Sequence, residues 1–182
     1  PTRRSSDLTP ELWRFWQSCG FTLVRLGTHR EASSGCYTAM ALYPLSEAGH
    51  CLASEEAQRL QRDEFWLREW RDEPVPLTAL KATILTEEDW LEVAGFAFAH
   101  RPLLTSAGSL NRLLMLVVLP LPALRARLQQ QDETALCRTL GLSGRKALLA
   151  RLREEAAQAL LSLDENRAND LRRQVQMLQF FN

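Results

Sequence analysis

Patterns typical of β-strands are confined to one short stretch of this chain, residues 21–45. "FTLVRL" (Phe21–Leu26) is β-prone and alternating, and "CYTAMALYPL" (Cys36–Leu45) is a second β-prone segment that Pro44 ends. The polar "GTHREASSG" between them predicts a flexible loop. Two antiparallel strands are too few to bury both faces of a sheet, so we expect partner strands from outside this stretch.

A short helix is predicted directly before the strands, in "TPELWRFWQSCG". Thr9 is placed to cap it, Pro10 suits its first turn, and Gly20 suits its C-terminal end. The helical period then divides the side chains between two faces. The face expected to be buried carries Leu12, Phe15, Trp16 and Cys19, and another face carries Glu11, Arg14 and Ser18.

From Ser46 onward the pattern is helical, with short loops between amphipathic segments, which is typical of an all-α bundle. "RDEPVPLTAL" (Arg71–Leu80) predicts a connector, and "TEEDW" (Thr86–Trp90) predicts a capping box. We therefore expect an α+β chain that is mostly α: a helix-strand-strand unit followed by a helical domain. The predicted helices span Glu47–Trp70, Glu87–Ala99, Gly108–Leu119, Ala123–Gln131, Glu133–Leu140, Ser143–Leu163 and Asp164–Phe180.

Charge is unevenly distributed along the chain, although the formal net charge is zero. Residues 45–100 hold 5 basic and 12 acidic residues, whereas residues 101–182 hold 12 basic and 7 acidic ones. A basic final third predicts a surface for a polyanion, and arginine suits phosphate contacts. The alternative is a solvated helix face, because Glu154 and Glu155 neutralise part of this charge. The candidate cations are Arg145, Lys146, Arg151 and Arg153 on one predicted helix and Arg167, Arg172 and Arg173 on the next.

Two helix ends add further candidates. The junction between two predicted helices is flanked by His100, Arg101 and Arg112, which could line a site. Alternatively, these cations could simply balance the negative end of the helix dipole. In "GLSGRK", Ser143 is the expected cap of a helix whose first N–H groups could accept a phosphate. This segment lacks the spacing of a nucleotide-binding phosphate loop.

Other site chemistries find little support in the sequence. His29, Cys36, His50 and Cys51 lack the spacing of a zinc site, so we expect no bound metal. The longest apolar run, which begins at Leu113, is too short to span a bilayer, so we expect no membrane partner. The four cysteines form no CxxC pair, which predicts reduced thiols in a cytoplasmic protein.

Long segments of the chain resemble a known family. "ELWRFWQSCGFTLVRLGTHREASSGCYTAMALYPLSEAG" is similar to the end of the acetyltransferase domain of bacterial tRNA(Met) cytidine acetyltransferases. "EDWLEVAGFAFAHRPLLTS" and "LSGRKALLARLREEAAQAL" are similar to segments of that family's C-terminal region. The resemblance is collinear and covers essentially Thr9 to Asn182.

This resemblance implies a place in RNA modification. The family forms N4-acetylcytidine at the wobble position of elongator tRNA(Met), with acetyl-CoA and ATP. The chain would hold the last helix and two strands of a GNAT acetyltransferase domain, followed by a helical tRNA-binding tail. The ATP site and the pyrophosphate loop would lie upstream, so we expect this piece alone to be inactive. No catalytic base is indicated.

The resemblance carries over only a few site residues. A glutamate of the family's last GNAT helix contacts acetyl-CoA, and Glu11 matches it. A cofactor-contacting arginine of the family is replaced by Ser18, and Arg14, one turn earlier on the same face, is a candidate substitute. The polar loop would lie beside the acetyl-transfer site, which makes His29 and Arg30 candidates for RNA contact.

Four regions are expected along the chain. The opening "PTRRSSDL" resembles the translated end of a sequencing adapter, so we expect residues 1–8 to be foreign and the rest to be a piece of a longer protein. Residues 9–45 would end the GNAT domain, 46–85 would form a helical connector, and 86–182 the tRNA-binding domain. Two alternatives stay open: a helical protein-interaction module, and a GNAT enzyme for a protein or small-molecule amine. The oligomeric state is not indicated.

Overall fold

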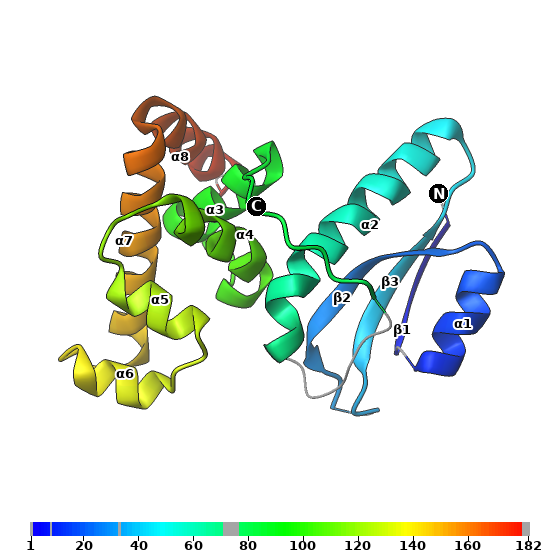
Figure 1. Ribbon diagram of the computed structural model, residues 1–182, viewed down its shortest axis with the longest axis horizontal. Helices are drawn as coiled ribbons and strands as arrows, with labels where there is room; N and C mark the ends of the chain where they lie inside the picture. Colours follow the sequence, from blue (N-terminus) through cyan, green and yellow to red (C-terminus); the bar gives the residue numbers. More distant parts are fainter. Residues whose placement is uncertain (1, 8, 33, 71–76, 180–182) are drawn as a thin grey trace. The chain divides into compact units, whose positions relative to one another are not determined.

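The computed structural model describes residues 2–7, 9–32, 34–70 and 77–179. The chain divides into two compact units, Pro1–Lys81 and Ala82–Asn182. The first unit holds a small sheet with two helices, and the second is entirely helical in its described residues (Figure 1). The expected fold class, α+β and mostly α, is confirmed.

The sheet of the first unit has three antiparallel strands in the order β1-β3-β2. The expected pair is confirmed as β2 (Thr22–Arg30) and β3 (Tyr37–Tyr43). A third strand, β1 (Thr2–Asp7), pairs with the other edge of β3 and had no counterpart in the sequence prediction. Strand β2 also continues four residues past Leu26, so His29 and Arg30 belong to a strand rather than to the predicted loop.

Helix α1 (Pro10–Ser18) is capped as the sequence predicts, because Thr9 Oγ1 accepts a hydrogen bond from the N–H of Leu12 at 3.2 Å. The expected buried stripe is partly wrong. Phe15 is 56% exposed, whereas Trp13 is only 7% exposed and packs into the main core of the sheet unit. The helix therefore meets the sheet through Trp13, together with Trp16 of the predicted stripe, which is partly buried against the same core.

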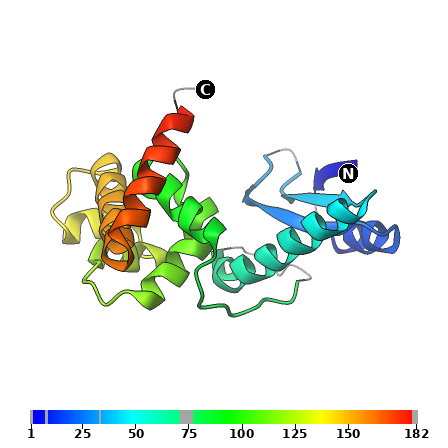
Figure 2. The ribbon, with the colours of Figure 1, turned by 90° about the horizontal axis from the view of Figure 1, so that it is seen from above.

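Helix α2 (Glu47–Leu67) begins at its cap Ser46 and packs against β2 and β3 (Figures 1 and 2). A 3₁₀ turn (Arg68–Trp70) continues it to the predicted end. Leu60 joins the same core as Trp13, and Ala53 packs against Val24 of β2. Apolar contacts thus hold α2 to the sheet.

Helix α3 is central to the second unit, because α4, α7 and α8 all pack against it. The predicted capping box at its start is confirmed: Asp89 accepts from the N–H of Thr86 at 2.9 Å, and the Thr86 hydroxyl accepts from the N–H of Asp89. Figure 2 shows α8 running alongside α3. The helices are α3 (Glu87–Phe98), α4 (Leu103–Leu116), α5 (Pro122–Leu128), α6 (Glu133–Thr139), α7 (Arg145–Leu163) and α8 (Glu165–Gln179).

Two predicted helix starts are wrong. Helix α4 begins at Leu103 rather than Gly108, because Pro102 supplies an extended N-cap residue from which the helix proceeds. Helix α7 is capped by Gly144 with φ 143°, not by Ser143, and within the described residues no side chain forms a capping hydrogen bond at its start. Such a φ value favours glycine, which explains why the neighbouring serine cannot serve there.

The core of the second unit is mostly apolar. Val93, Ala94 and Phe96 of α3 are fully buried, and Leu110 and Leu113 of α4 lie equally deep. None of the helices in the described part of the chain is long and apolar enough to cross a membrane.

Candidate nucleic-acid interface

One of the predicted RNA-binding residues, Arg112, lies inside the helical unit. Its side chain is 0% exposed, and its Nη2 donates to Asp89 Oδ1 at 2.5 Å. A guanidinium without solvent exposure cannot reach a phosphate, so the expected RNA contact of Arg112 is wrong. The sequence placed it in an amphipathic helix, but its partner Asp89 is 23 residues away and gave no local signal.

Asp89 is the centre of a buried polar network between α3 and α4. Burial opposes its ionisation, but the hydrogen bond and charge of Arg112, with further bonds from Thr86 and Ser109, lower its pKa to about 2. The Ser109 hydroxyl lies 2.8 Å from Asp89 and 2.7 Å from the buried Glu92. The network thus joins the two helices through charged groups.

Arg101 reaches the surface from the edge of this network. Its guanidinium donates to Glu92 and to the carbonyl oxygen of Thr105, and its side chain is 29% exposed. Glu92 in turn contacts Ser109. Arg101 is therefore held in one position, with much of its charge balanced by a buried carboxylate.

Arg151 has a structural partner of its own. Its Nε donates to Glu155 at 3.0 Å, and Glu155, which is fully buried, also accepts from the N–H groups of Ala123 and Leu124. Glu155 therefore caps the N-terminus of α5 from inside the unit. Arg151 also pairs with the exposed Glu154 at 3.3 Å, so its charge is shared between two carboxylates.

Three other surface cations form ion pairs. Arg145 pairs with Glu133 at 3.0 Å, although its side chain is 85% exposed. Arg173 pairs with Asp170, and Arg167 pairs with Glu87. Each pair reduces the positive field that its arginine presents to a polyanion.

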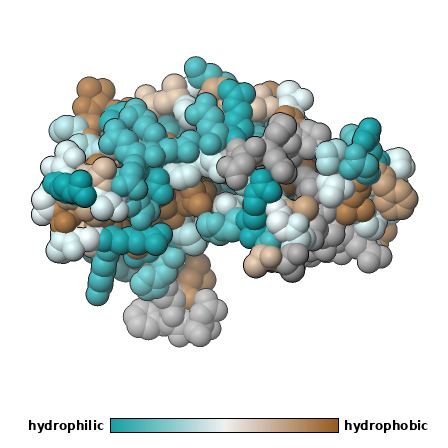
Figure 3. Space-filling model, turned by 90° about the horizontal axis from the view of Figure 1, so that it is seen from below, coloured by the Kyte–Doolittle hydropathy of each residue, from teal (hydrophilic) through white to brown (hydrophobic). Residues whose placement is uncertain are grey.

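Arginines of α7 and α8 also stack on aromatic rings of α3. The guanidinium of Arg153 lies 5.9 Å from the ring centre of Phe96, and that of Arg172 lies 5.4 Å from Phe98. Arg167 lies 4.4 Å from Trp90, near the start of α3. The order of the two α8 contacts shows that α8 runs parallel to α3. Hydrophilic side chains cover much of the helical unit at the left of Figure 3.

Two more candidates lie in the sheet unit, at the end of β2. His29 and Arg30 are both exposed. Arg30 Nη1 donates to the carbonyl oxygen of Gly35 at 2.7 Å, and its guanidinium lies over the ring of Tyr37. Arg30 therefore closes the β2–β3 turn, whereas His29 carries no such bond among those the structure gives.

The predicted cofactor residues share the exposed face of α1. Arg14 Nη2 donates to Glu11 at 3.1 Å, and the two side chains are 72% and 75% exposed. Ser18 Oγ donates to the carbonyl oxygen of Phe15 at 2.7 Å. The structure thus brings the three residues onto one face, where Arg14 is the single cation.

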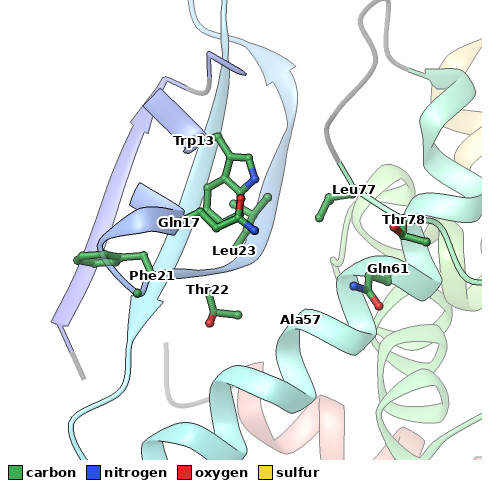
Figure 4. A pocket seen from close by; sticks show the side chains of 10 residues that line it. Trp13, Gln17, Phe21, Thr22, Leu23, Ala57, Gln61, Leu77 and Thr78 are labelled. Atoms are coloured by element: carbon green, nitrogen blue, oxygen red, sulfur yellow. The ribbon is translucent and has the colours of Figure 1, made fainter. Parts of the chain in front are cut away.

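The sheet unit also contains a cavity of about 470 Å³ that the sequence did not predict. Trp13, Gln17 and Leu23 face Gln61, Leu77 and Thr78 across it (Figure 4). Among the residues that the structure describes, no charged side chain lines this cavity, and Glu11, Arg14 and Ser18 lie outside it. The lining residues are Trp13, Gln17, Gly20, Phe21, Thr22, Leu23, Ala57, Gln61, Leu77 and Thr78.

The remaining candidates are Lys146 and a residue that sequence patterns did not single out, Arg138. Both are exposed, Lys146 in the first turn of α7 and Arg138 in the last turn of α6. Within the described residues neither forms an ion pair. No sequence pattern indicated Arg138, because it belongs to no run of basic residues.

Comparison with known proteins finds one matching family and several similar relatives. The profile of a family described as "tRNA-binding domain" matches residues 49–166. The tRNA(Met) cytidine acetyltransferase TmcA of Salmonella typhimurium is 62% identical over 169 residues, which are 92% of this chain and 25% of that protein. TmcA of Citrobacter koseri is 61% identical over 97% of the chain, and TmcA of Haemophilus influenzae is 38% identical over 62% of it. The chain spans about a quarter of the length of the first two curated relatives.

Proposed function

Because this chain belongs to the tRNA-binding domain family, whose profile covers residues 49–166, we propose that it binds tRNA and that its helical unit supplies most of the contacts. The family match is the observation that carries this proposal. The exposed cations of α7 and α8 support it, because phosphate contacts supply most of the affinity of a protein for folded RNA. A-form RNA is recognised mainly by its shape and backbone, which suits a surface of arginines on rigid helices.

The wider proposal is that the chain serves tRNA(Met) cytidine acetylation as part of a longer enzyme. It rests on the 62% identity to a protein of that name. The substrate would be the wobble cytidine of elongator tRNA(Met), and the base must leave the anticodon stack to be acetylated. The helical unit would hold the tRNA body in register while upstream domains supply ATP binding and most of the acetyltransferase sheet. Such an enzyme would act in the cytoplasm.

The exposed face of α1 is the part of this chain that we propose for acetyl-CoA binding. When bound, acetyl-CoA supplies an acetyl group to the exocyclic amine, which loses a proton as CoA leaves as a thiol. Arg14 suits one phosphate of such a ligand, and Glu11 is an acceptor on the same face. Arg14 must share or give up its contact with Glu11 to do so, at a cost of about 0.5 kcal/mol for an exposed ion pair, so it should contribute less than an unpaired arginine would. The neutral Ser18 contributes at most a hydrogen bond.

Salt-dependent binding of labelled tRNA(Met) to the 182-residue chain tests the proposal. Fluorescence anisotropy between about 50 and 300 mM salt should show an affinity that falls linearly on a log–log plot, because bound phosphates release counterions. Absence of binding, or an affinity that ignores salt, would instead favour a helical protein-interaction module. If the chain binds tRNA but the longer relatives acetylate only proteins or small amines, the RNA-modification proposal is wrong.

A further inference from the structure

The surface cations of the helical unit fall into two classes that the sequence does not distinguish. Arg145 and Arg173 are each paired with a carboxylate, Glu133 and Asp170 respectively. Their immediate neighbours, Lys146 and Arg172, form no ion pair within the described part of the chain and are exposed. Within each of these two pairs of neighbouring cations, the two members therefore differ mainly in whether a carboxylate neutralises the charge.

A third cation, Arg153, also forms no ion pair with the described residues and links these two. Arg153 lies seven residues after Lys146 on α7, so both occupy one face of that helix, about 10 Å apart along its axis. Arg153 stacks on Phe96, and Arg172 of α8 stacks on Phe98 of the same last turn of α3. The three cations thus run from the first turn of α7 to α8 by way of the C-terminal turn of α3.

Stacking and ion pairing affect phosphate binding in opposite ways. An arginine in an ion pair presents little net field, and it must share or break its carboxylate contact to bind a phosphate. An arginine held against a phenylalanine ring keeps its full charge and loses less side-chain entropy on binding. We propose that Lys146, Arg153 and Arg172 form the phosphate-binding strip for the tRNA backbone, and that Arg145 and Arg173 contribute little. This rests on the tRNA binding proposed above.

The adjacent residues provide matched control variants. Lys146→Gln and Arg172→Gln each remove one charge, as do Arg145→Gln and Arg173→Gln at the neighbouring positions. We expect each of the first two, and Arg153→Gln, to weaken binding of labelled tRNA(Met) by about threefold to tenfold near 100 mM salt. Each should also reduce the log–log salt slope by roughly 0.7 to 0.9, the loss of one phosphate contact. The controls should stay within about twofold, with an unchanged slope. Circular dichroism melts establish that every variant is folded.

The outcomes separate this inference from the proposed function. If the unmodified chain binds no tRNA, the proposed function fails, and the strip fails with it. If the chain binds tRNA but Arg145→Gln and Arg173→Gln weaken the binding as much as Lys146→Gln and Arg172→Gln do, the affinity depends only on overall charge. In that case the inference alone is wrong, and the proposed function stands. Displacement of tRNA by polyglutamate at equal charge concentration would also overturn it, since the strip would then bind any polyanion.

Discussion

Arg112 and Asp89 form an ion pair in the interior of the helical unit, with 2.5 Å between Nη2 and Oδ1 and side chains 0% and 4% exposed. Because Asp89 also caps α3, the pair joins the start of that helix to the C-terminal half of α4. A buried pair of this kind adds little net stability over apolar side chains of the same shape. Loss of one partner, however, leaves an uncompensated charge in the core.

Replacement of Arg112 should therefore lower the stability of the helical unit and leave the proposed RNA-binding surface unchanged. We expect Arg112→Met to lower the free energy of unfolding by about 3 to 5 kcal/mol, because Asp89 stays buried without its counter-ion. Urea denaturation of the 182-residue chain measures this. Arg173→Met, at an exposed pair, is the control and should cost no more than about 0.5 kcal/mol. A folded Arg112→Met chain with a reduced tRNA salt slope would contradict the structural role.

Acid should remove the stabilisation that Asp89 provides. Its pKa is lowered to about 2 in the folded chain, so its contribution is fully present above pH 4 and is lost as the pH falls towards 2. The shift corresponds to roughly 2 kcal/mol. Stability measured from pH 5 to pH 2 should fall less steeply in Asp89→Asn, which keeps the side-chain shape without the charge. Parallel curves for the two proteins would show that Asp89 does not titrate in this way.

Glu155 should be essential for the attachment of α5 to α7. Glu155→Ala leaves the buried N–H groups of Ala123 and Leu124 without their acceptor, for which we expect a loss of about 2 to 4 kcal/mol in the free energy of unfolding. The neighbouring Glu154→Ala removes only an exposed contact with Arg151 and should cost about 0.5 kcal/mol or less. Equal losses in thermal or urea unfolding would mean that Glu155 does not cap α5.

The face of α1 makes a separate prediction about acetyl-CoA. In an intact relative that carries this segment, alanine at the position of Arg14 should weaken acetyl-CoA binding only about twofold to threefold, because Arg14 must first share or give up its contact with Glu11. Calorimetric titration measures it. Alanine at the position of Phe15, exposed on a different side of α1, serves as the control. Unchanged affinity in the Arg14 variant would remove this face from the cofactor site.

Local patterns in the sequence predicted the elements well. Thr9 and Thr86 both cap the helices they were expected to cap, because capping depends only on residues within one turn. The β-strand pair followed from local β-propensity in the same way. The start of α7 was predicted wrongly, because its N-cap residue has a φ of 143°, which favours Gly144 over Ser143.

Features that depend on contacts between distant residues could not be predicted. The sequence indicated that Arg112 is a surface cation, but in the fold it is buried beside Asp89. The division of the basic residues into paired and unpaired classes likewise depends on carboxylates from other turns and helices, such as Glu133 for Arg145. The sequence therefore indicated a basic region, and the fold indicates which of its cations have a carboxylate partner among the described residues.

The location of the tRNA interface is the most direct test of these conclusions. Hydrogen–deuterium exchange of the 182-residue chain, with and without saturating tRNA(Met), would map it peptide by peptide. We predict protection in peptides from the last turn of α3, the first half of α7 and the middle of α8, where Phe98, Arg153 and Arg172 lie. Protection confined to residues 1–81, with the helical unit unchanged, would contradict tRNA binding by the helices.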